Sequence, residues 1–323
     1  MRLTYREALR LGLKEVLATH KNSFLIGEDV GAYGGTYAVS KDFLAEFGSE
    51  RIIDAPLSEV GFTGIGIGAA MGGMKPIVEI MTVNFALLAF DQIINSAAIV
   101  NFMSGGQISL PLVIRMTSGG GRQLAAQHSN SFEGWLAHIP GLKILTPATV
   151  EDARFMLGYA IKENSPVLLI EHALLFNQSA ECRENISDFT PYKAQIKKPG
   201  KDLTLITYGG MLPRCLKASD EMEKKGREIE VIDLRSLRPL DDETIFTSLR
   251  KTHRVLIVDE GWRSGSLSAE ISARIMESCF YDLDAPVQRL CRKEVPIPYA
   301  RHLEEAIIPQ IADIVLKLEE MFK

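Results

Sequence analysis

The sequence predicts an α/β protein with two domains, each built on a mostly parallel sheet covered by helices. Its 323 residues suit two domains at roughly 150 residues each. Short apolar runs alternate with helical patterns, as in parallel sheets that are covered on both faces. Around 179–202 the composition becomes polar and irregular, ending in a Lys-Lys-Pro-Gly-Lys stretch typical of a linker. We therefore place the first domain at 1–185, a linker at 186–201 and the second domain at 202–323.

The first domain begins with a helix signal and then alternates between strands and helices. Thr4 and Glu7 have the spacing of a capping box, in which each side chain satisfies a free amide at a helix start. The apolar runs predict buried strands at Phe24–Ile26, Ile77–Met81, Leu112–Arg115 and Val167–Glu171. Helical patterns lie between them at 60–73, 84–103 and 149–163.

The second domain repeats the alternation. Strands are predicted at Leu203–Thr207, Ile229–Leu234, Val255–Val258 and Val287–Leu290, with helices at 212–225, 241–251 and 266–279. A last amphipathic helix is expected over 303–321. No catalytic cluster stands out in this half of the chain, and the stretch from Asp259 to Trp262 is interpreted as a loop at a subunit contact.

The composition excludes several classes of function. The formal charge is 36 − 41 = −5, and the chain has no run of like charges that would favour a nucleic-acid partner. Four widely spaced cysteines indicate buried free thiols rather than disulfides or a zinc site. The start of the chain lacks a signal pattern. The longest apolar stretch, Asn84–Met103, carries Asp91, which is costly in a membrane. We expect a soluble cytoplasmic protein without a membrane span.

A glycine-rich stretch from Asp54 to Gly73 is the densest motif and has three interpretations. It can be a tight turn followed by a small-residue helix that only packs on a sheet. It can bind a dinucleotide, because Gly64, Gly66 and Ala69 fit G-x-G-x-x-G/A and Glu79 ends the next predicted strand. This motif is weak here, because the glycines do not directly follow a strand. The third interpretation makes Glu59 the functional group.

Glu59 is placed where a parallel sheet normally binds its ligands, at a turn from strand to helix. Its apolar neighbours Leu57 and Val60 are expected to remove water from the carboxyl and raise its pKa. A carboxyl that stays protonated can donate a hydrogen bond to a basic ring nitrogen. Because a glutamate at a helix start also favours the helix dipole, these arguments alone leave Glu59 as a candidate.

Several motifs, found in order along nearly the whole chain, resemble one family. They include Leu25-Ile-Gly-Glu-Asp-Val30, Arg51-Ile-Ile-Asp-Ala-Pro-Leu-Ser-Glu-Val-Gly-Phe62, Asp91-Gln-Ile-Ile-Asn-Ser-Ala-Ala98, Ala126-Gln-His-Ser129, His138-Ile-Pro-Gly-Leu-Lys143, Leu234-Arg-Ser-Leu-Arg-Pro-Leu-Asp241 and Val295-Pro-Ile-Pro-Tyr-Ala300. The chain resembles the β subunit of the heterotetrameric E1 component of 2-oxo acid dehydrogenase complexes, most closely the pyruvate dehydrogenase type. That family has a transketolase-like pyrimidine-binding domain and a transketolase C-terminal domain.

The resemblance implies a thiamine diphosphate enzyme that is active only with its α subunit, in an α₂β₂ heterotetramer. The α chain would hold the diphosphate and Mg²⁺ through a Gly-Asp-Gly motif, which this chain lacks. Glu59 matches the family's glutamate on the pyrimidine N1′, where proton exchange leads to loss of the thiazolium C2 proton and to decarboxylation of the 2-oxo acid. The acyl group would then pass to the lipoyl group of the E2 acyltransferase, which the second domain would dock.

Other site residues follow from the same resemblance. Phe85 would lie beside the aminopyrimidine ring, with Leu57 and Met81 completing that wall and Glu28 nearby as a second carboxylate. His128 would stand at the active-site entrance, where it orients or protonates the lipoyl disulfide. Each has a purely structural alternative, since most buried aromatics and lone histidines only pack.

Related β subunits hold a monovalent cation, K⁺, mostly through carbonyl oxygens. The matching positions are Leu112, Ala160, Ile161, Glu163 and Ser165, although Glu163 and Ser165 replace the usual Asp and Asn. The substrate stays open at this point, because branched-chain 2-oxo acid and acetoin dehydrogenases use similar β chains. Two alternatives of other classes are an NAD-binding oxidoreductase and a non-catalytic scaffold subunit.

Overall fold

The computed structural model describes residues 1–323, and these divide into two compact units. The first unit comprises Met1–Ser118 and Leu136–Pro191. The second comprises Gly119–Trp135 and Tyr192–Lys323. Residues 119–135, which the sequence placed in the first domain, thus belong with the second unit, because their polar contacts described below are made there.

The first unit is organised around a parallel sheet. Its strands lie in the order β6-β7-β5-β4-β2-β3, and every neighbouring pair is parallel. All residues of β2, β5 and β7 are buried, because helices cover both faces of such a sheet. The strands are β2 (Ser23–Gly27), β3 (Ile52–Asp54), β4 (Lys75–Ile80), β5 (Val113–Ser118), β6 (Lys143–Leu145) and β7 (Val167–His172). The predicted strands of this half are confirmed, whereas the short β3 and β6 were not predicted.

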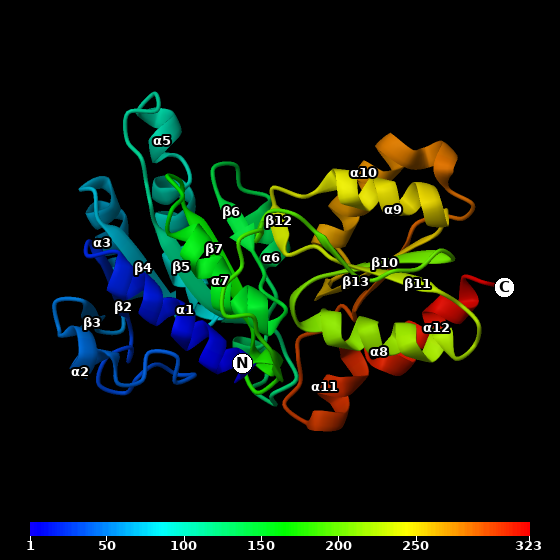
Figure 1. Ribbon diagram of the computed structural model, residues 1–323, viewed down its shortest axis with the longest axis horizontal. Coiled ribbons are helices and arrows are strands. Elements are labelled where there is room, and N and C mark those ends of the chain that lie inside the picture. Colours follow the sequence, from blue (N-terminus) through cyan, green and yellow to red (C-terminus); the bar gives the residue numbers. More distant parts are fainter. The chain divides into compact units, whose positions relative to one another are not determined.

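Two helices of the first unit pack against each other, α1 (Tyr5–Thr19) and α7 (Val150–Ala160) (Figure 1). Both begin with a capping box, and that of α1 is the predicted pair of Thr4 and Glu7. Helix α3 (Glu59–Met71) packs on β4. The remaining elements are β1 (Arg2–Thr4), which pairs antiparallel with β8 (Ser179–Glu181), α2 (Phe43–Phe47) and η4 (Ala173–Leu175). Helix α6 (Glu133–Ala137) begins in the second unit and ends in the first.

The continuous helix predicted over 84–103 is wrong. The segment consists of α4 (Val83–Ala86), η1 (Leu87–Ala89), the π-helix η2 (Gln92–Ala97) and α5 (Val100–Met103). In the π-helical turn the Ala98 amide bonds to the Ile93 carbonyl at 3.0 Å, one residue further than in an α-helix. No single helix in the chain has the length and apolar character of a membrane span; only the pair 83–89 and 92–103, bent by 65°, meets those criteria jointly.

The second unit has a five-stranded sheet in the order β14-β13-β10-β11-β9. Figure 1 shows α9 and α10 on one face of this sheet and α8 and α12 on the other. The strands are β9 (Gln195–Lys198), β10 (Leu203–Thr207), β11 (Ile229–Asp233), β13 (Val255–Trp262) and β14 (Gln288–Arg292). The helices are η5 (Gly209–Met211), α8 (Leu212–Glu223), α9 (Asp242–Thr252), α10 (Leu267–Cys279) and η6 (Phe280–Asp282), and β12 (Ser236–Arg238) follows β11.

Three features of this unit differ from the sequence prediction. The stretch Asp259–Trp262, interpreted as a loop, is the last part of strand β13. The expected linker contains β9, which pairs antiparallel with β11, whereas the other strand pairs of the sheet are parallel. The last helix is divided into α11 (Arg301–Ile307) and α12 (Ile311–Glu320). Pro309 explains the break, because it has no amide to donate and keeps the preceding Ile308 extended at ψ 134°. The four cysteines are free, as predicted, and all but Cys291 are buried.

Candidate functional site

The carboxyl ends of three neighbouring strands bring most of the predicted site residues to one edge of the first sheet. Gly27 at the end of β2 is in register with Asp54 of β3 and Glu79 of β4. Glu28 therefore follows β2 at the same edge at which Met81 follows β4. The short connection after β3 leads there to Glu59, the first residue of α3. This is the edge at which open parallel sheets bind ligands.

Glu59 is buried at the start of α3 and keeps one acceptor unused. Ser58 caps the helix by accepting a hydrogen bond from the Gly61 amide at 3.3 Å. The Glu59 side chain is 4% exposed, and its Oε2 atom has no hydrogen-bond partner. One turn later, the hydroxyl of Thr63 is also buried without a partner. Buried polar atoms are nearly always paired, so Glu59 and Thr63 are candidate contacts for a ligand at this edge of the sheet.

A second carboxyl, that of Glu28, lies within the electrostatic influence of Glu59. Partial burial raises the pKa of Glu28, and the charges of Glu59 and Asp29 raise that pKa further. Asp54 fixes the loop after Glu28, because its carboxylate accepts hydrogen bonds from the amides of Gly31 at 2.5 Å and Ala32 at 2.9 Å. The structure thus brings Glu28 and Glu59 together.

The explanation given for the burial of Glu59 is wrong. Leu57 is 73% exposed and Val60 is 44% exposed, so neither removes water from the carboxyl within this chain. Leu57 precedes α3 and Val60 is the second residue of this helix. Both side chains are exposed to solvent. Met81 and Phe85 lie at the edge after β4 and are partly buried, Phe85 within the short helix α4.

Thr63 and Asp54 are the site residues that the sequence analysis missed. Thr63 could have been found from its spacing of four residues after Glu59, which puts both side chains on one helix face. Asp54 carries no such signal, because its role depends on the path of a loop more than 20 residues earlier in the chain.

The dinucleotide interpretation does not fit the geometry. Gly64 and Gly66 lie inside α3, so they do not form the strand-to-helix turn that cradles a pyrophosphate. A Cβ at Gly66 would approach the Val78 side chain to 2.5 Å. This glycine therefore allows α3 to pack closely on β4. Glu79, the candidate ribose ligand, is instead paired with Arg115.

Arg115 lies between two carboxylates in the core of the first unit. Its Nε and Nη2 atoms donate to the two oxygens of Glu171 at 2.9 and 2.7 Å, while Nη1 pairs with Glu79. The three side chains stand on the adjacent strands β4, β5 and β7 and are at most 8% exposed. Each carboxylate is thus held by the guanidinium that separates them.

His128 belongs to the second unit and lies on the loop between Gly119 and Asn130, called here the His128 loop. It ends the short helix η3 (Ala126–His128), and its side chain is exposed. The amide of Gly119 bonds to the carbonyl of Asn130 at 3.0 Å, which closes the base of the loop. Ser129 beside it is buried, and its hydroxyl has no partner.

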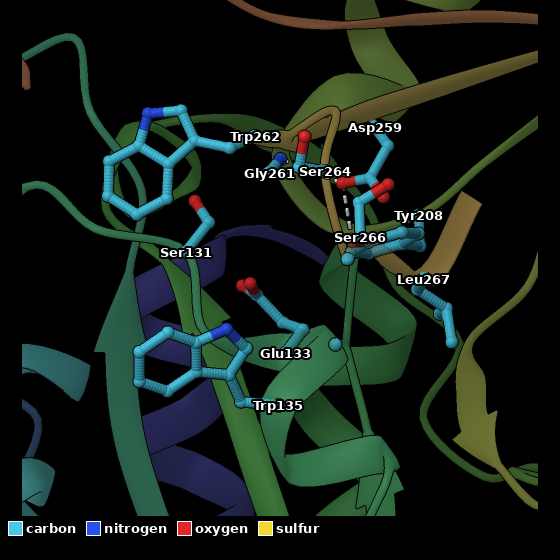
Figure 2. Close-up of a pocket in the computed structure, with 12 residues that line it drawn as sticks. Ser131, Glu133, Trp135, Tyr208, Asp259, Gly261, Trp262, Ser264, Ser266 and Leu267 are labelled. Carbon is cyan, nitrogen blue, oxygen red and sulfur yellow. Dashed lines mark hydrogen bonds between the residues drawn. The ribbon is translucent and has the colours of Figure 1, made fainter. Parts of the chain in front are cut away.

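A small pocket lies beyond the end of this loop in the second unit (Figure 2). In this view the Glu133 carboxylate lies between the indole rings of Trp135 and Trp262. Asp259 accepts hydrogen bonds from the Tyr208 hydroxyl and the Gly261 amide, both at 2.7 Å. The cavity volume of about 20 Å³ leaves room for about one water molecule. We therefore interpret the pocket as part of the packing around 131–135.

The predicted monovalent cation site already contains two lysine side chains. The Lys75 ammonium donates to the Ile161 carbonyl at 3.0 Å, and Lys143 pairs with the Glu163 carboxylate. The carbonyl of Leu112 accepts from the Val167 amide. Elsewhere, the structure holds no group of three or more His, Cys, Asp or Glu side chains that could bind a metal ion.

The surface around α3 is unusually apolar. A groove of about 520 Å³ runs between α3 and the residues from 92 to 108. A Cβ at Gly68 would meet nothing within 4 Å, so this face of α3 is open. Large apolar side chains are exposed along the same elements, namely Leu57, Val60, Ile65, Met71, Leu87, Leu88, Phe102 and Met103. Exposed apolar side chains beside an open groove favour a protein interface on this face.

Two protein families match the chain in succession. The family "Transketolase, pyrimidine binding domain" matches residues 1–178, and "Transketolase, C-terminal domain" matches residues 192–314. The second match begins at residue 192, where the second unit resumes after Pro191. Together they cover nearly the whole chain.

Three relatives that match nearly the whole chain are named as the beta subunit of one enzyme component. A protein of Arabidopsis thaliana named "Pyruvate dehydrogenase E1 component subunit beta-1, mitochondrial" is 45% identical over 97% of this chain and 87% of its own length. The Bos taurus beta subunit is 42% identical over 99% and 90%, and that of Rhizobium meliloti is 44% identical over 97% and 68%. A solved structure, "Split gene transketolase, inactive beta4 tetramer", has a similar fold, with a TM-score of 0.81 at 23% identity, covering 98% of this chain and 97% of its own.

Proposed function

The chain belongs to the family of pyruvate dehydrogenase E1 component beta subunits, and we propose that it forms the pyrimidine-binding half of a thiamine diphosphate site for the decarboxylation of pyruvate. The single observation that carries the proposed site is the buried Oε2 atom of Glu59, which lacks a partner. The relatives share the name of this enzyme component along the length of the chain, which supports pyruvate over branched-chain 2-oxo acids and acetoin.

The residues at the sheet edge fit the cofactor. An aminopyrimidine has a ring nitrogen that can exchange a proton with a carboxyl, and Glu59 has an acceptor free for that bond. Met81 and Phe85 would supply an apolar wall, and an aromatic contact of this kind contributes roughly 0.5–1.5 kcal/mol. When bound, thiamine diphosphate supplies an acceptor for the electrons released as CO₂ leaves a 2-oxo acid.

Glu59 would act in proton exchange. Its buried Oε2 atom, which has no partner within the chain, would hold a proton against the ring nitrogen and release it reversibly. Glu28 would serve as a second carboxyl close to the cofactor. Leu57, exposed in this chain, would complete the apolar wall only where a partner subunit covers it.

An α subunit would complete the enzyme. The apolar groove along α3 and the exposed side chains around it support a protein partner on this face. We propose that this partner holds the diphosphate and Mg²⁺, in an α₂β₂ heterotetramer, and that the second unit docks the E2 acyltransferase. The cytoplasmic location stays a prediction of the sequence.

His128 would serve the second half of the reaction. When a lipoyl disulfide breaks, one sulfur bonds to the acyl carbon and the other leaves as a thiolate that needs a proton. A histidine is suited to donate that proton near neutral pH, and His128 is exposed on its loop. The residue would therefore act on the arriving lipoyl group and not on decarboxylation.

A bound K⁺ is not part of this proposal. The ammonium of Lys75 lies on one of the predicted carbonyl ligands, and Lys143 occupies the Glu163 carboxylate. Two ammonium groups at these ligands repel a further cation, so the residues do not fit it.

Glu59→Gln tests the proposal. The amide keeps the shape of the side chain but cannot exchange a proton, so pyruvate decarboxylation should fall by at least 10²-fold. The chain is co-expressed with its α partner and assayed with an artificial electron acceptor, using pyruvate, a branched-chain 2-oxo acid and acetoin in parallel. Glu151→Gln, in the first turn of α7, is the control. Near-normal turnover by an assembled Glu59→Gln complex would refute the role of Glu59.

A further inference from the structure

We propose that Glu304, Glu260 and Arg292 are positioning residues that hold the His128 loop in the conformation from which His128 acts. The inference rests on the proposed role of His128 in acyl transfer. It adds residues from the opposite end of the chain, on β13, β14 and α11, to which no role has been assigned above.

The first half of the loop is held through its backbone. Glu304 accepts hydrogen bonds from the amides of Gly121 at 2.8 Å and Gln123 at 3.0 Å, one on each carboxylate oxygen. Glu260 accepts from the amide of Gly120 at 2.7 Å. Both carboxylates are buried, at 1% and 5% exposure. Hydrogen bonds from amides to ionised carboxylates are stronger than neutral ones.

The second half of the loop is held by a buried guanidinium. Arg292 donates to the Ser129 carbonyl at 3.2 Å and to the Ser131 hydroxyl at 3.2 Å. The same side chain donates to Glu260 Oε1 at 2.9 Å, the atom that also receives the Gly120 amide. The pair of Arg292 and Glu260 therefore joins the beginning and the end of the loop.

The loop needs such support because its sequence and conformation favour disorder. Three consecutive glycines at 119–121 lose more backbone entropy on ordering than other residues do. Gln123 and Ala125 have φ values of 57° and 59°, in a region that residues with a Cβ rarely adopt. Ala125 directly precedes the helical turn that carries His128. Strained residues of this kind persist only where their surroundings fix them.

The arrangement differs from ordinary core packing in where its hydrogen bonds end. Four backbone groups of the loop, at residues 120, 121, 123 and 129, bond to buried charged side chains. The residue His128, which lies between these positions in the sequence, is exposed. Hydrogen bonds from buried side chains to the loop backbone can fix the position of His128 while its own side chain stays accessible to a large substrate.

Glu304→Gln is the test, measured in the assembled complex. The amide group of glutamine cannot accept from both loop amides, so hydrogen exchange at Gly121 and Gln123 should rise at least tenfold. Reductive acylation of free lipoyl domain should fall at least tenfold, while decarboxylation with an artificial acceptor stays within twofold. Glu294→Gln is the matched control, because Glu294 also accepts a backbone amide, that of Ser264 at 2.8 Å, outside the loop.

A double-mutant cycle with His128→Ala separates positioning from mere stability. If Glu304 acts through His128, adding Glu304→Gln to His128→Ala should cost no further acylation activity. Independent losses that multiply would overturn the inference, as would unchanged hydrogen exchange in Glu304→Gln. If exchange rises and His128→Ala loses acylation while Glu304→Gln retains it, positioning is refuted and the role of His128 stands. If His128→Ala acylates normally, the role of His128 fails and the inference falls with it.

Discussion

Two buried glutamates of the first unit, Glu171 on β7 and Glu59 on α3, are held in opposite ways. Glu171 is 0% exposed, and both of its oxygens accept hydrogen bonds from Arg115. Glu59 is 4% exposed, and its Oε2 atom accepts none. Each oxygen of the Glu171 carboxylate has a hydrogen-bond donor within the chain, whereas one oxygen of Glu59 has none.

The difference separates a carboxylate that contributes to the stability of the unit from one that has a free acceptor. A buried acceptor without a partner costs about 1–3 kcal/mol. This cost is present at Glu59 and absent at Glu171, which supports our proposal that the start of α3 binds a ligand.

The largest effect is expected from Arg115→Met on the satisfied side. The substitution leaves Glu79 and Glu171 as adjacent buried carboxylates without a counter-ion, and breaking a buried pair in this way costs about 3–5 kcal/mol. Thermal unfolding of the purified chain should shift downwards by roughly 6–20 °C, at 2–4 °C for each kcal/mol. Arg183→Met is the control, because its pair with Glu151 is on the surface and Arg183 is 58% exposed. A midpoint equal to that of this control would show that the three charges add nothing to stability.

Glu59→Met should have the opposite effect on stability. Methionine has nearly the same length and no unsatisfied oxygen, so the isolated chain should unfold at the same midpoint or gain about 1 kcal/mol. The same substitution at Glu171 should lose about 3–5 kcal/mol, since it leaves Arg115 with only one carboxylate. Urea unfolding of both variants measures the contrast. A clear loss of stability in Glu59→Met would mean that the Glu59 carboxylate has stabilising partners within the chain and is not available to a ligand.

The sequence predicted most strands of the two sheets but not the interruptions in two of the helices. Long apolar runs such as Val167–Glu171 determine buried strands locally, and the strands predicted from them are found. The helix predicted over 84–103 fails because its mostly apolar pattern cannot distinguish a straight helix from one interrupted by a π-turn. The division at Pro309 was readable, because proline disfavours a helical residue before it.

At the site, too, features set by neighbouring residues were predicted, whereas contacts between residues far apart in the sequence were not. The place of Glu59 at a helix start followed from its motif, whereas its burial does not come from the adjacent Leu57 and Val60. Asp54 acts on a loop more than 20 residues earlier, and Glu304 acts on one 183 residues earlier. Contacts of this range have no periodic pattern in one sequence, so only the folded chain reveals them.

The smallest effect concerns Glu28, whose charge couples to Glu59. Burial and the Glu59 charge raise the pKa of Glu28 above its ordinary value of 4.5. The folded chain therefore binds this proton more tightly than the unfolded chain does. The contribution is fully present below pH 4.5 and is lost as the pH rises through the raised pKa. Glu28→Gln should remove it and leave a stability profile that rises less as the pH falls from neutral to about 5.

Urea unfolding at a series of pH values checks this effect, with Glu7→Gln as a control of opposite sign. Hydrogen bonds from the backbone and side chain of Thr4 lower the pKa of Glu7, so its contribution is present above pH 4.5 and lost as the pH falls. Glu7→Gln should therefore lower the free energy of unfolding most at neutral pH. At that pH Glu28→Gln should raise it. If Glu28→Gln and the parent chain have the same pH profile, neither burial nor the Glu59 charge raises the pKa of Glu28. The proposed electrostatic coupling between Glu28 and Glu59 would then be refuted.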